Sequence, residues 1–253
     1  MTDTYLAAAT DLARAMGDLA LRYYGAELHV DMKGDGSPVT EADRAAEELA
    51  REWIERRFPD DGVLGEEFGT VRPDARRRWI IDPIDGTRSF VRTVPLWGSL
   101  VAVLEGDTVL AGAAYFPAVS ESISAAPGAG CWWNDRRASV SDRSELGSAL
   151  VVATDDRFPS HPGRRAAWSA LADRAGTART WGDCFGYLLI ATGRAEVMVD
   201  DIVSPWDAAA FHPIVTEAGG VFTDWNGTGG PLVGDVIATN AALAGTVRSL
   251  LVR

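Results

Sequence analysis

The stretch from residue 79 to residue 90 carries the side chains whose chemistry is easiest to interpret. An apolar run ends at Ile81 and leads directly into Asp82 and Asp85, which lie three residues apart. Pro83 between them has no backbone donor and bends the chain, so the two carboxylates can converge on one point. Two like charges held close are costly unless a cation neutralises them, and an all-oxygen ligand set suits Mg²⁺ or Mn²⁺. An ordinary turn at a strand end would use the same residues, so the spacing alone leaves both interpretations open.

The residues that follow extend this pattern. Gly86 and Thr87 stand at the predicted start of a helical turn, where backbone N–H groups would bind a phosphate. Two more acids lie elsewhere in the chain: Glu66 follows a short apolar strand, and Asp207 follows a Pro-Trp pair at a predicted helix start. Taken singly, each of these two acids is typical of a solvated surface or a helix cap.

In combination, these motifs resemble those of the inositol monophosphatase superfamily of metal-dependent phosphomonoesterases. The matching residues are Gly65-Glu66-Glu67, Asp82-Pro83-Ile84-Asp85-Gly86-Thr87, and Trp206-Asp207 followed by Glu217-Ala218-Gly219-Gly220. The resemblance implies an α+β fold, a layered αβαβα sandwich of the inositol monophosphatase and fructose bisphosphatase type. It also implies two or three Mg²⁺ ions, or Mn²⁺ in their place, as cofactors for hydrolysis of a phosphate ester by water.

The resemblance further implies a role for each residue at a family position. The metal ligands would be the side chains of Glu66, Asp82, Asp85 and Asp207 and the carbonyl oxygen of Ile84. Thr87, paired with Asp43, would orient or deprotonate the attacking water, and Glu66 is counted with them as catalytic. Lys33 lies in the loop where the family holds its third metal, and it is the only lysine among 24 basic residues. Chance placement of a lone lysine is an equally good interpretation.

Substrate choice in this superfamily depends on residues outside the metal motif. The segment Trp181-Gly182-Asp183 places an acid where the inositol enzymes have small residues, and Asp200 stands where the family commonly has a glutamate. Two added carboxylates suit an alcohol that carries positive charge. The segment resembles that of the histidinol-phosphate phosphatases of this superfamily, which implies hydrolysis of L-histidinol phosphate in histidine biosynthesis. The expected substrate-binding residues are Gly86, Thr87, Trp181, Gly182, Asp183, Asp200 and Asp207.

An aromatic side chain is also a candidate to stack on the imidazole of that substrate. Trp97 and Trp181 are the two candidates, although a tryptophan at a strand end more often packs in the core.

Composition limits the partners of this chain. Its 253 residues carry a formal net charge of −12, which makes it a poor candidate for binding nucleic acid or an anionic membrane. No apolar run approaches the roughly 20 residues that span a bilayer, and the N-terminus lacks the pattern of a signal peptide. We therefore expect a cytoplasmic protein that acts on a small phosphorylated metabolite, and the resemblance implies a homodimer.

Helical and strand patterns place these motifs in two halves. Residues 1–142 are expected to form a sheet backed by two helices, and residues 143–253 an alternation of helices and strands. The first half carries Glu66 and the run 82–87, and the second carries Asp183, Asp200 and Asp207. We expect helices at residues 1–25, 40–58, 164–174, 185–192, 208–217 and 240–251, a loop at 31–38, and strands at 63–64, 79–81, 99–104, 109–116, 121–125, 150–153, 196–199 and 221–223.

Other functions fit these residues less well. Cys131 and Arg137 have the spacing of cysteine phosphatases, but no glycine lies between them to form a phosphate-binding loop. An inositol-1-monophosphatase or a broad-specificity phosphatase of the same superfamily is the main alternative. A non-catalytic relative that only binds metal or a phospholigand is the alternative from another class, and the presence of all the expected acids argues against it.

Overall fold

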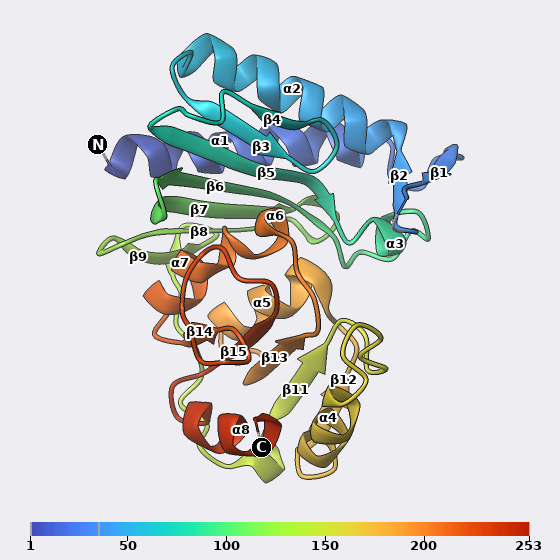
Figure 1. Cartoon of the computed structure of the whole chain (residues 1–253), viewed down its shortest axis with the longest axis vertical. Helices are drawn as coiled ribbons and strands as arrows, with labels where there is room; N and C mark the ends of the chain where they lie inside the picture. The colour runs from blue at the N-terminus through green and yellow to red at the C-terminus, as the bar shows by residue number, and fades with distance from the viewer. Residues whose placement is uncertain (1, 35, 253) are drawn as a thin grey trace.

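The computed structural model describes residues 2–34 and 36–252 and arranges them in alternating layers of helices and sheets (Figure 1). The helices are α1 (Thr2–Leu21), α2 (Glu41–Arg57), α3 (Thr87–Phe90), α4 (Arg164–Ala172), α5 (Asp183–Ala191), α6 (Pro205–Ala208), α7 (Phe211–Glu217) and α8 (Ala244–Leu251). Among the described residues, no helix is long and apolar enough to cross a membrane.

Within residues 2–34 and 36–252 the strands form three sheets. The largest has the order β10-β9-β8-β7-β6-β5-β3-β4, the second has the order β12-β11-β13-β15-β14, and the smallest pairs β1 with β2. The strands are β1 (Val30–Met32), β2 (Pro38–Thr40), β3 (Gly62–Gly65), β4 (Gly69–Val71), β5 (Arg77–Asp85), β6 (Gly98–Glu105), β7 (Thr108–Phe116), β8 (Glu121–Ala126), β9 (Gly130–Trp133), β10 (Arg136–Arg137), β11 (Leu150–Ala153), β12 (Thr177–Arg179), β13 (Val197–Asp200), β14 (Val221–Thr223) and β15 (Val236–Thr239).

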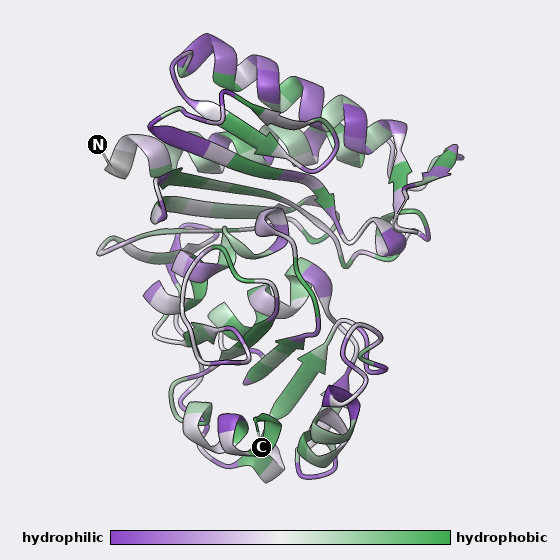
Figure 2. Ribbon diagram, in the orientation of Figure 1, coloured by the Kyte–Doolittle hydropathy of each residue, from purple (hydrophilic) through white to green (hydrophobic). Residues whose placement is uncertain are grey.

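Alternation of side chains along the strands explains the layers. One face of the eight-stranded sheet, which includes Trp79, packs against α1 and α2, and its other face, which includes Ile80, packs against α5 and α7. The inner face of the five-stranded sheet joins this second core through Met198. Its outer face, which includes Val151, packs against α4 and α8. The α+β fold and αβαβα layering that we expected are therefore confirmed. Figure 2 shows the strands as mostly hydrophobic, with hydrophilic residues on the outer helix α2.

Most of the expected elements are present, but two segments differ from expectation. The loop predicted at 31–38 is wrong, because Val30–Met32 and Pro38–Thr40 pair as antiparallel strands β1 and β2. The single helix predicted at 208–217 is also wrong, because the chain forms α6 and α7 with a break between Ala208 and Phe211. Pro213 explains this break, since it has no N–H to donate to the carbonyl four residues earlier. The short strands β12 and β15 carry too few residues to give a clear alternating pattern.

A bulge in β5 brings the two central acids to the same side of the sheet. Asp82 pairs with Leu100 of β6 and Asp85 pairs with Gly98, so three steps along β5 oppose two along β6. In a regular strand, residues three apart point to opposite faces, and one extra residue reverses this. Pro83 lies inside the bulge, where its missing N–H interrupts no ladder bond, and its carbonyl accepts a hydrogen bond from Ser99 Oγ at 2.6 Å.

The boundary that we expected near residue 142 falls between the last strand of the larger sheet, which ends at Arg137, and the first of the second sheet, which begins at Leu150. The division into halves 1–142 and 143–253 stays a prediction.

Candidate active site

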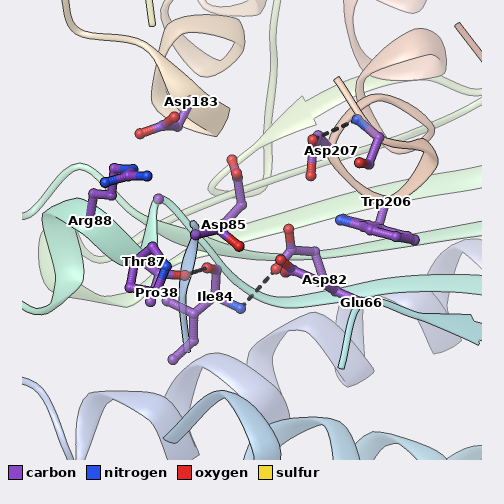
Figure 3. A pocket seen from close by; sticks show the side chains of 13 residues that line it. Pro38, Glu66, Asp82, Ile84, Asp85, Thr87, Arg88, Asp183, Trp206 and Asp207 are labelled. Carbon is purple, nitrogen blue, oxygen red and sulfur yellow. Dashed lines mark hydrogen bonds between the residues drawn. The ribbon is translucent and has the colours of Figure 1, made fainter. Parts of the chain in front are cut away.

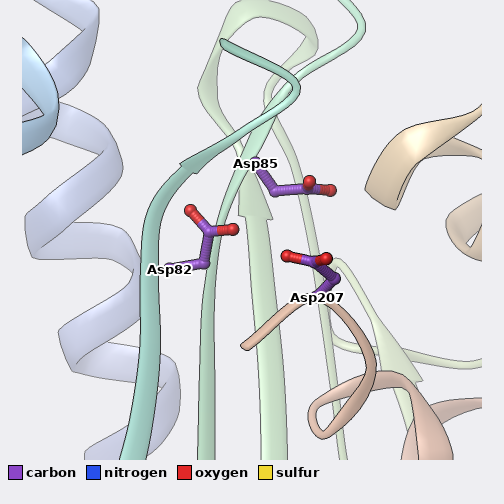
Figure 4. Close-up of side chains that lie close together, drawn as sticks. All are labelled: Asp82, Asp85 and Asp207. Atoms are coloured by element: carbon purple, nitrogen blue, oxygen red, sulfur yellow. The ribbon is translucent and has the colours of Figure 1, made fainter. Parts of the chain in front are cut away.

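Three buried or half-buried carboxylates from both parts of the chain meet at one point. Asp82 and Asp85 lie at the end of β5, and Asp207 lies in α6 (Figure 4). One carboxylate oxygen from each of the three residues lies within 4.8 Å of the others. Asp85 and Asp207 are more than 120 residues apart in the sequence, and the packing of α6 against β5 and β6 brings them together.

Each of these three acids has one oxygen fixed by a backbone N–H group. Asp82 Oδ1 accepts from Ile84 N at 3.0 Å, and Asp207 Oδ2 accepts from Ser204 N at 2.7 Å. Asp85 Oδ2 accepts from Cys184 N at the start of α5. These bonds set the direction of each carboxylate, and its second oxygen remains available in the space that the three residues share (Figure 3).

The electrostatics of this cluster call for a cation. Burial raises the pKa of Asp82 well above its usual value, and the nearby charges of Glu66, Asp85 and Asp207 raise it further. Burial and the charges of Asp183 and Asp207 raise the pKa of Asp85 in the same way. Burial raises the pKa of Asp207 to about 7. Among the described side chains, no Lys, Arg or His forms an ion pair with these three acids. The oxygen-only donor set therefore fits a hard divalent cation such as Mg²⁺.

A cavity of about 210 Å³ contains this cluster. The residues that line it are Ser37, Pro38, Glu66, Asp82, Ile84, Asp85, Gly86, Thr87, Arg88, Asp183, Ser204, Trp206 and Asp207 (Figure 3). All the residues that we expected to bind metal thus face one space. Glu66 enters it from the turn after β3, and Lys33 of the β1–β2 hairpin lies beside it, with its Nζ 2.7 Å from Glu66 Oε1 and 2.6 Å from Glu67 Oε1.

Thr87 and Asp43 form a pair at the inner edge of the cavity. Thr87 Oγ1 lies 3.3 Å from Asp43 Oδ1 and 2.9 Å from the carbonyl oxygen of Ile84. The other oxygen of Asp43 closes the capping box of α2, because it accepts from Thr40 N and Thr40 Oγ1. Asp43 is fully buried, and this burial raises its pKa although the bonds from Thr40 oppose the shift. Asp43 is thus held in one orientation with Oδ1 directed at Thr87.

Not all of the expected substrate-binding residues line the main cavity. Asp183 lines the main cavity, and Gly182 lines a neighbouring cavity of about 490 Å³ that shares Asp183 and Arg88 with it. Asp200 is buried at the end of β13, where it accepts a hydrogen bond from Tyr187 Oη. Trp181 is exposed, with its ring centroid 6.0 Å from the Arg179 guanidinium, and it does not line either cavity. Its role in substrate binding stays a prediction.

Trp97 does not have the exposed ring face that stacking on a ligand requires. It is fully buried and packs against Tyr24 and Phe90, with ring centroids at 5.4 and 4.8 Å. The thiol of Cys131 is likewise unsuited to nucleophilic attack, because burial raises its pKa to about 12. This position agrees with our argument from the sequence against a cysteine-phosphatase mechanism at Cys131.

Arg88 and Thr154 are among the cavity residues that were not identified from the sequence. Arg88 follows Thr87 directly and lines both cavities, and its guanidinium donates to the carbonyl of Gly36 at 3.0 Å. Thr154 follows strand β11, and its Oγ1 accepts from Asp183 N at 2.8 Å. A hydroxyl residue at the carboxyl end of a parallel strand is a recognised position for ligand contacts, so Thr154 could have been found by its place after the 150–153 strand.

Comparison with known proteins gives matches that cover nearly the whole chain. The profile of the inositol monophosphatase family matches residues 1–252. A histidinol-phosphatase of Chlorobaculum parvum is 46% identical over 236 residues, which are 92% of this chain and 91% of that protein. A histidinol-phosphatase of Mycobacterium tuberculosis is 40% identical, over 92% of this chain and 93% of that protein. The structure of an inositol monophosphatase from Zymomonas mobilis is similar with a TM-score of 0.88, at 30% identity and 98% coverage of both chains.

The fold, the acidic cavity and these relatives define a phosphoric monoester hydrolase. The chain belongs to the inositol monophosphatase family. The resemblance that we saw to the histidinol-phosphate phosphatases is confirmed by the two relatives of that name.

The raised pKa values predict how the metal-free protein responds to pH. Burial raises the pKa of Asp200 and of Asp207 to about 7, from 3.8 in an unfolded chain. Between these values the folded protein holds protons that the unfolded chain releases, so this part of the stability is present at low pH and is lost as the pH rises through 7. We expect the melting temperature of EDTA-treated protein to fall between about pH 5.5 and about pH 8.

Divalent cations should reverse this trend, because they replace the protons as partners of the carboxylates. Differential scanning fluorimetry with and without Mg²⁺ measures the effect, and the gain from Mg²⁺ should be larger at the higher pH. A gain that is larger at the lower pH would contradict the assignment of Asp207 to a cation site.

Proposed function

We propose that this chain hydrolyses L-histidinol phosphate to L-histidinol and phosphate, a step of histidine biosynthesis, with two or three Mg²⁺ ions (or Mn²⁺) held by Glu66, Asp82, Asp85, Asp207 and the carbonyl of Ile84. The single observation that carries the choice of substrate is the carboxylate of Asp183. It lies at the junction of the two cavities, and it accepts no hydrogen bond from any residue that the structure describes.

A carboxylate in this position favours a cationic partner. Burial raises the pKa of Asp183 to about 6, and the positive charge of Arg88 opposes this shift. An ammonium or imidazolium group of the substrate would restore the solvation that Asp183 has lost. The backbone supports this placement, because Asp183 has a φ of 48° and its N–H is held by Thr154. A strained residue held beside a catalytic cavity is typical of a functional position.

The protein's own residues would prepare the attacking water as follows. Thr87 Oγ1 accepts a proton from the water and passes its own proton to Asp43 Oδ1, which lies 3.3 Å away. Asp43 cannot turn away, because its other oxygen is held by Thr40. When bound, the cations supply positive charge to the phosphoryl oxygens and make a coordinated water more acidic. The phosphate would lie among the acids, and the alcohol would extend towards Asp183 and the second cavity.

Inositol phosphate is the second candidate substrate, and Asp200 argues against it. The family commonly has a longer glutamate at this position, where it contacts substrate hydroxyls. In this chain the side chain is one methylene shorter, and one of its oxygens is occupied by Tyr187 Oη inside the core. Asp200 therefore has less capacity to bind a polyol.

We also expect the protein to form a homodimer and to act in the cytoplasm, and both expectations stay predictions.

Phosphate release from a panel of esters tests this function. With Mg²⁺ present, kcat/KM for L-histidinol phosphate should exceed that for inositol 1-phosphate, fructose 1,6-bisphosphate and adenosine 3′,5′-bisphosphate by about 10- to 100-fold, the value of one charge-assisted contact. A preference for inositol 1-phosphate would refute the proposed substrate, and no release from any ester would favour a non-catalytic relative.

Replacement of Asp183 by Asn tests the recognition of the cation. Asp183→Asn keeps the shape and tolerates the left-handed backbone, but it removes the charge. KM for L-histidinol phosphate should rise about 10- to 100-fold, while kinetics with p-nitrophenyl phosphate, whose alcohol part carries no positive charge, stay nearly unchanged. Asp156→Asn is the matched control, because Asp156 is an exposed neighbouring acid outside both cavities. Equal losses on both esters would show that Asp183 supports the structure and not the choice of alcohol.

A bulky residue at position 180 tests whether the second cavity receives the alcohol. Thr180 is exposed and lines this cavity, so Thr180→Trp would fill it without disturbing the core. Inhibition by the product L-histidinol should weaken about tenfold or more, while inhibition by inorganic phosphate should not change. Thr177→Trp, at an exposed position of β12 outside the cavity, is the control. If L-histidinol inhibits the Thr180→Trp variant as it does the wild type, the alcohol lies elsewhere.

A further inference from the structure

Glu47 is a buried acid that lies outside the cavity and takes no direct part in the chemistry described above. It lies on the side of α2 that faces the sheet, and its side chain is fully buried. A buried carboxylate is costly unless it is paired and fully hydrogen-bonded. Its contacts therefore indicate what the fold gains from it.

The contacts of Glu47 lead to the turn that carries Glu66. Arg51, one helical turn further along α2, donates to Glu47 Oε1 through Nε at 2.8 Å and Nη2 at 2.7 Å. Glu47 Oε1 also accepts from Phe68 N at 3.1 Å, and Glu47 Oε2 accepts from Glu67 N at 2.7 Å. Arg51 itself donates to the carbonyl of Gly69. The ion pair between buried Glu47 and half-buried Arg51 thus binds the backbone of the β3–β4 connection at residues 67, 68 and 69.

The backbone of the turn fits closely around this carboxylate. Gly65 and Gly69 pair across the β3–β4 hairpin, so residues 66–68 form the whole connection. A Cβ atom at position 65 would lie 2.1 Å from Glu47 Oε1, and only glycine allows the strand to approach so closely. Glu66 is the one residue of the connection that lines the main cavity, and its neighbour Glu67 is bound to Glu47 through the backbone.

We infer that Glu47, paired with Arg51, is a positioning residue for the cation site: it fixes the turn at residues 66–68 and so holds Glu66 at the distance from Asp82 at which both can bind one cation. The inference rests on the metal role proposed for Glu66 and is independent of the identity of the phosphate ester. Residues that orient a metal ligand typically change metal affinity about 10- to 100-fold when replaced.

Glu47→Gln is the direct test, because the amide keeps the shape but presents a donor to Glu67 N or to Arg51, where an acceptor is needed. We measure the binding of Mn²⁺ to the full chain by electron paramagnetic resonance of the free ion, with no ester present. The variant should bind Mn²⁺ about 10- to 100-fold more weakly than the wild type, and kcat should recover largely at saturating Mn²⁺. Glu48→Gln is the matched control, because Glu48 is the exposed neighbour on the same helix.

Several outcomes would overturn the inference or separate it from the proposed function. A folded Glu47→Gln variant with wild-type Mn²⁺ affinity and only a lower melting temperature would reduce Glu47 to a structural residue. If this variant does not fold, Arg51→Lys is used instead. Lysine keeps the positive charge, but it cannot reproduce the paired Nε and Nη2 hydrogen bonds from Arg51 to Glu47. This variant should weaken Mn²⁺ binding in the same direction, and unchanged affinity would again overturn the inference. Failure of the wild type itself to bind Mn²⁺ would refute the metal site and, with it, this inference, whereas a wild type that binds Mn²⁺ but does not prefer L-histidinol phosphate would refute only the proposed ester.

Discussion

Repulsion between carboxylates is the constraint on which this structure depends. Asp82, Asp85 and Asp207 converge within 4.8 Å of one another, in surroundings that raise the pKa of each. Groups that repel one another do not hold a geometry by themselves, so the surrounding backbone must hold it. The N–H groups that do so come from Ile84, Ser204 and Cys184, which belong to three separate segments of the chain.

Each layer of the fold contributes one part of this arrangement. The bulge in β5 turns Asp82 and Asp85 to the same side, and the capping box of α6 fixes Asp207 as it starts the helix. The start of α5 supplies the N–H for Asp85 and places Asp183 next to it. In α2, the capping residue Asp43 also faces Thr87. In several of these acids, one carboxylate oxygen therefore stabilises the local backbone and the other faces the cavity. The same residue can for this reason be both a helix cap and a residue of the active site.

The sequence was sufficient for the layered fold and for the acids that line the main cavity, but not for Arg88 and Thr154 or for the contacts that hold the acids in place. The convergence of Asp82 and Asp85 was expected from a bend at Pro83, whereas the structure achieves it through an extra residue in β5 opposite β6, which depends on how the two strands pair. Glu47 has the helical spacing of the buried Ala50 and Ile54, but only the tertiary contacts with residues 67 and 68 show what its carboxylate binds. The β1–β2 pairing involves three residues per strand, too few for a periodic pattern.

The positions of the single lysine and of the clustered acids relate the net charge of −12 to the cavity. Lys33 forms ion pairs with Glu66 and Glu67. Gly36, which lies between β1 and β2 as Lys33 does, accepts a hydrogen bond from the Arg88 guanidinium through its carbonyl oxygen. A lysine ammonium is a compact charge on a flexible chain, so it can contact both acids without the planar geometry that a guanidinium requires. The cluster of Asp82, Asp85 and Asp207 lies beyond these ion pairs. In the function that we propose, cations from solution would bind this cluster, make the cavity locally positive and so admit a phosphate. Asp183 would lie outside the neutralised cluster, so its charge would be available for the opposite end of the substrate. In this way an acidic protein would bind an ester that is anionic at one end and cationic at the other, because cations would neutralise only the carboxylates around the phosphate.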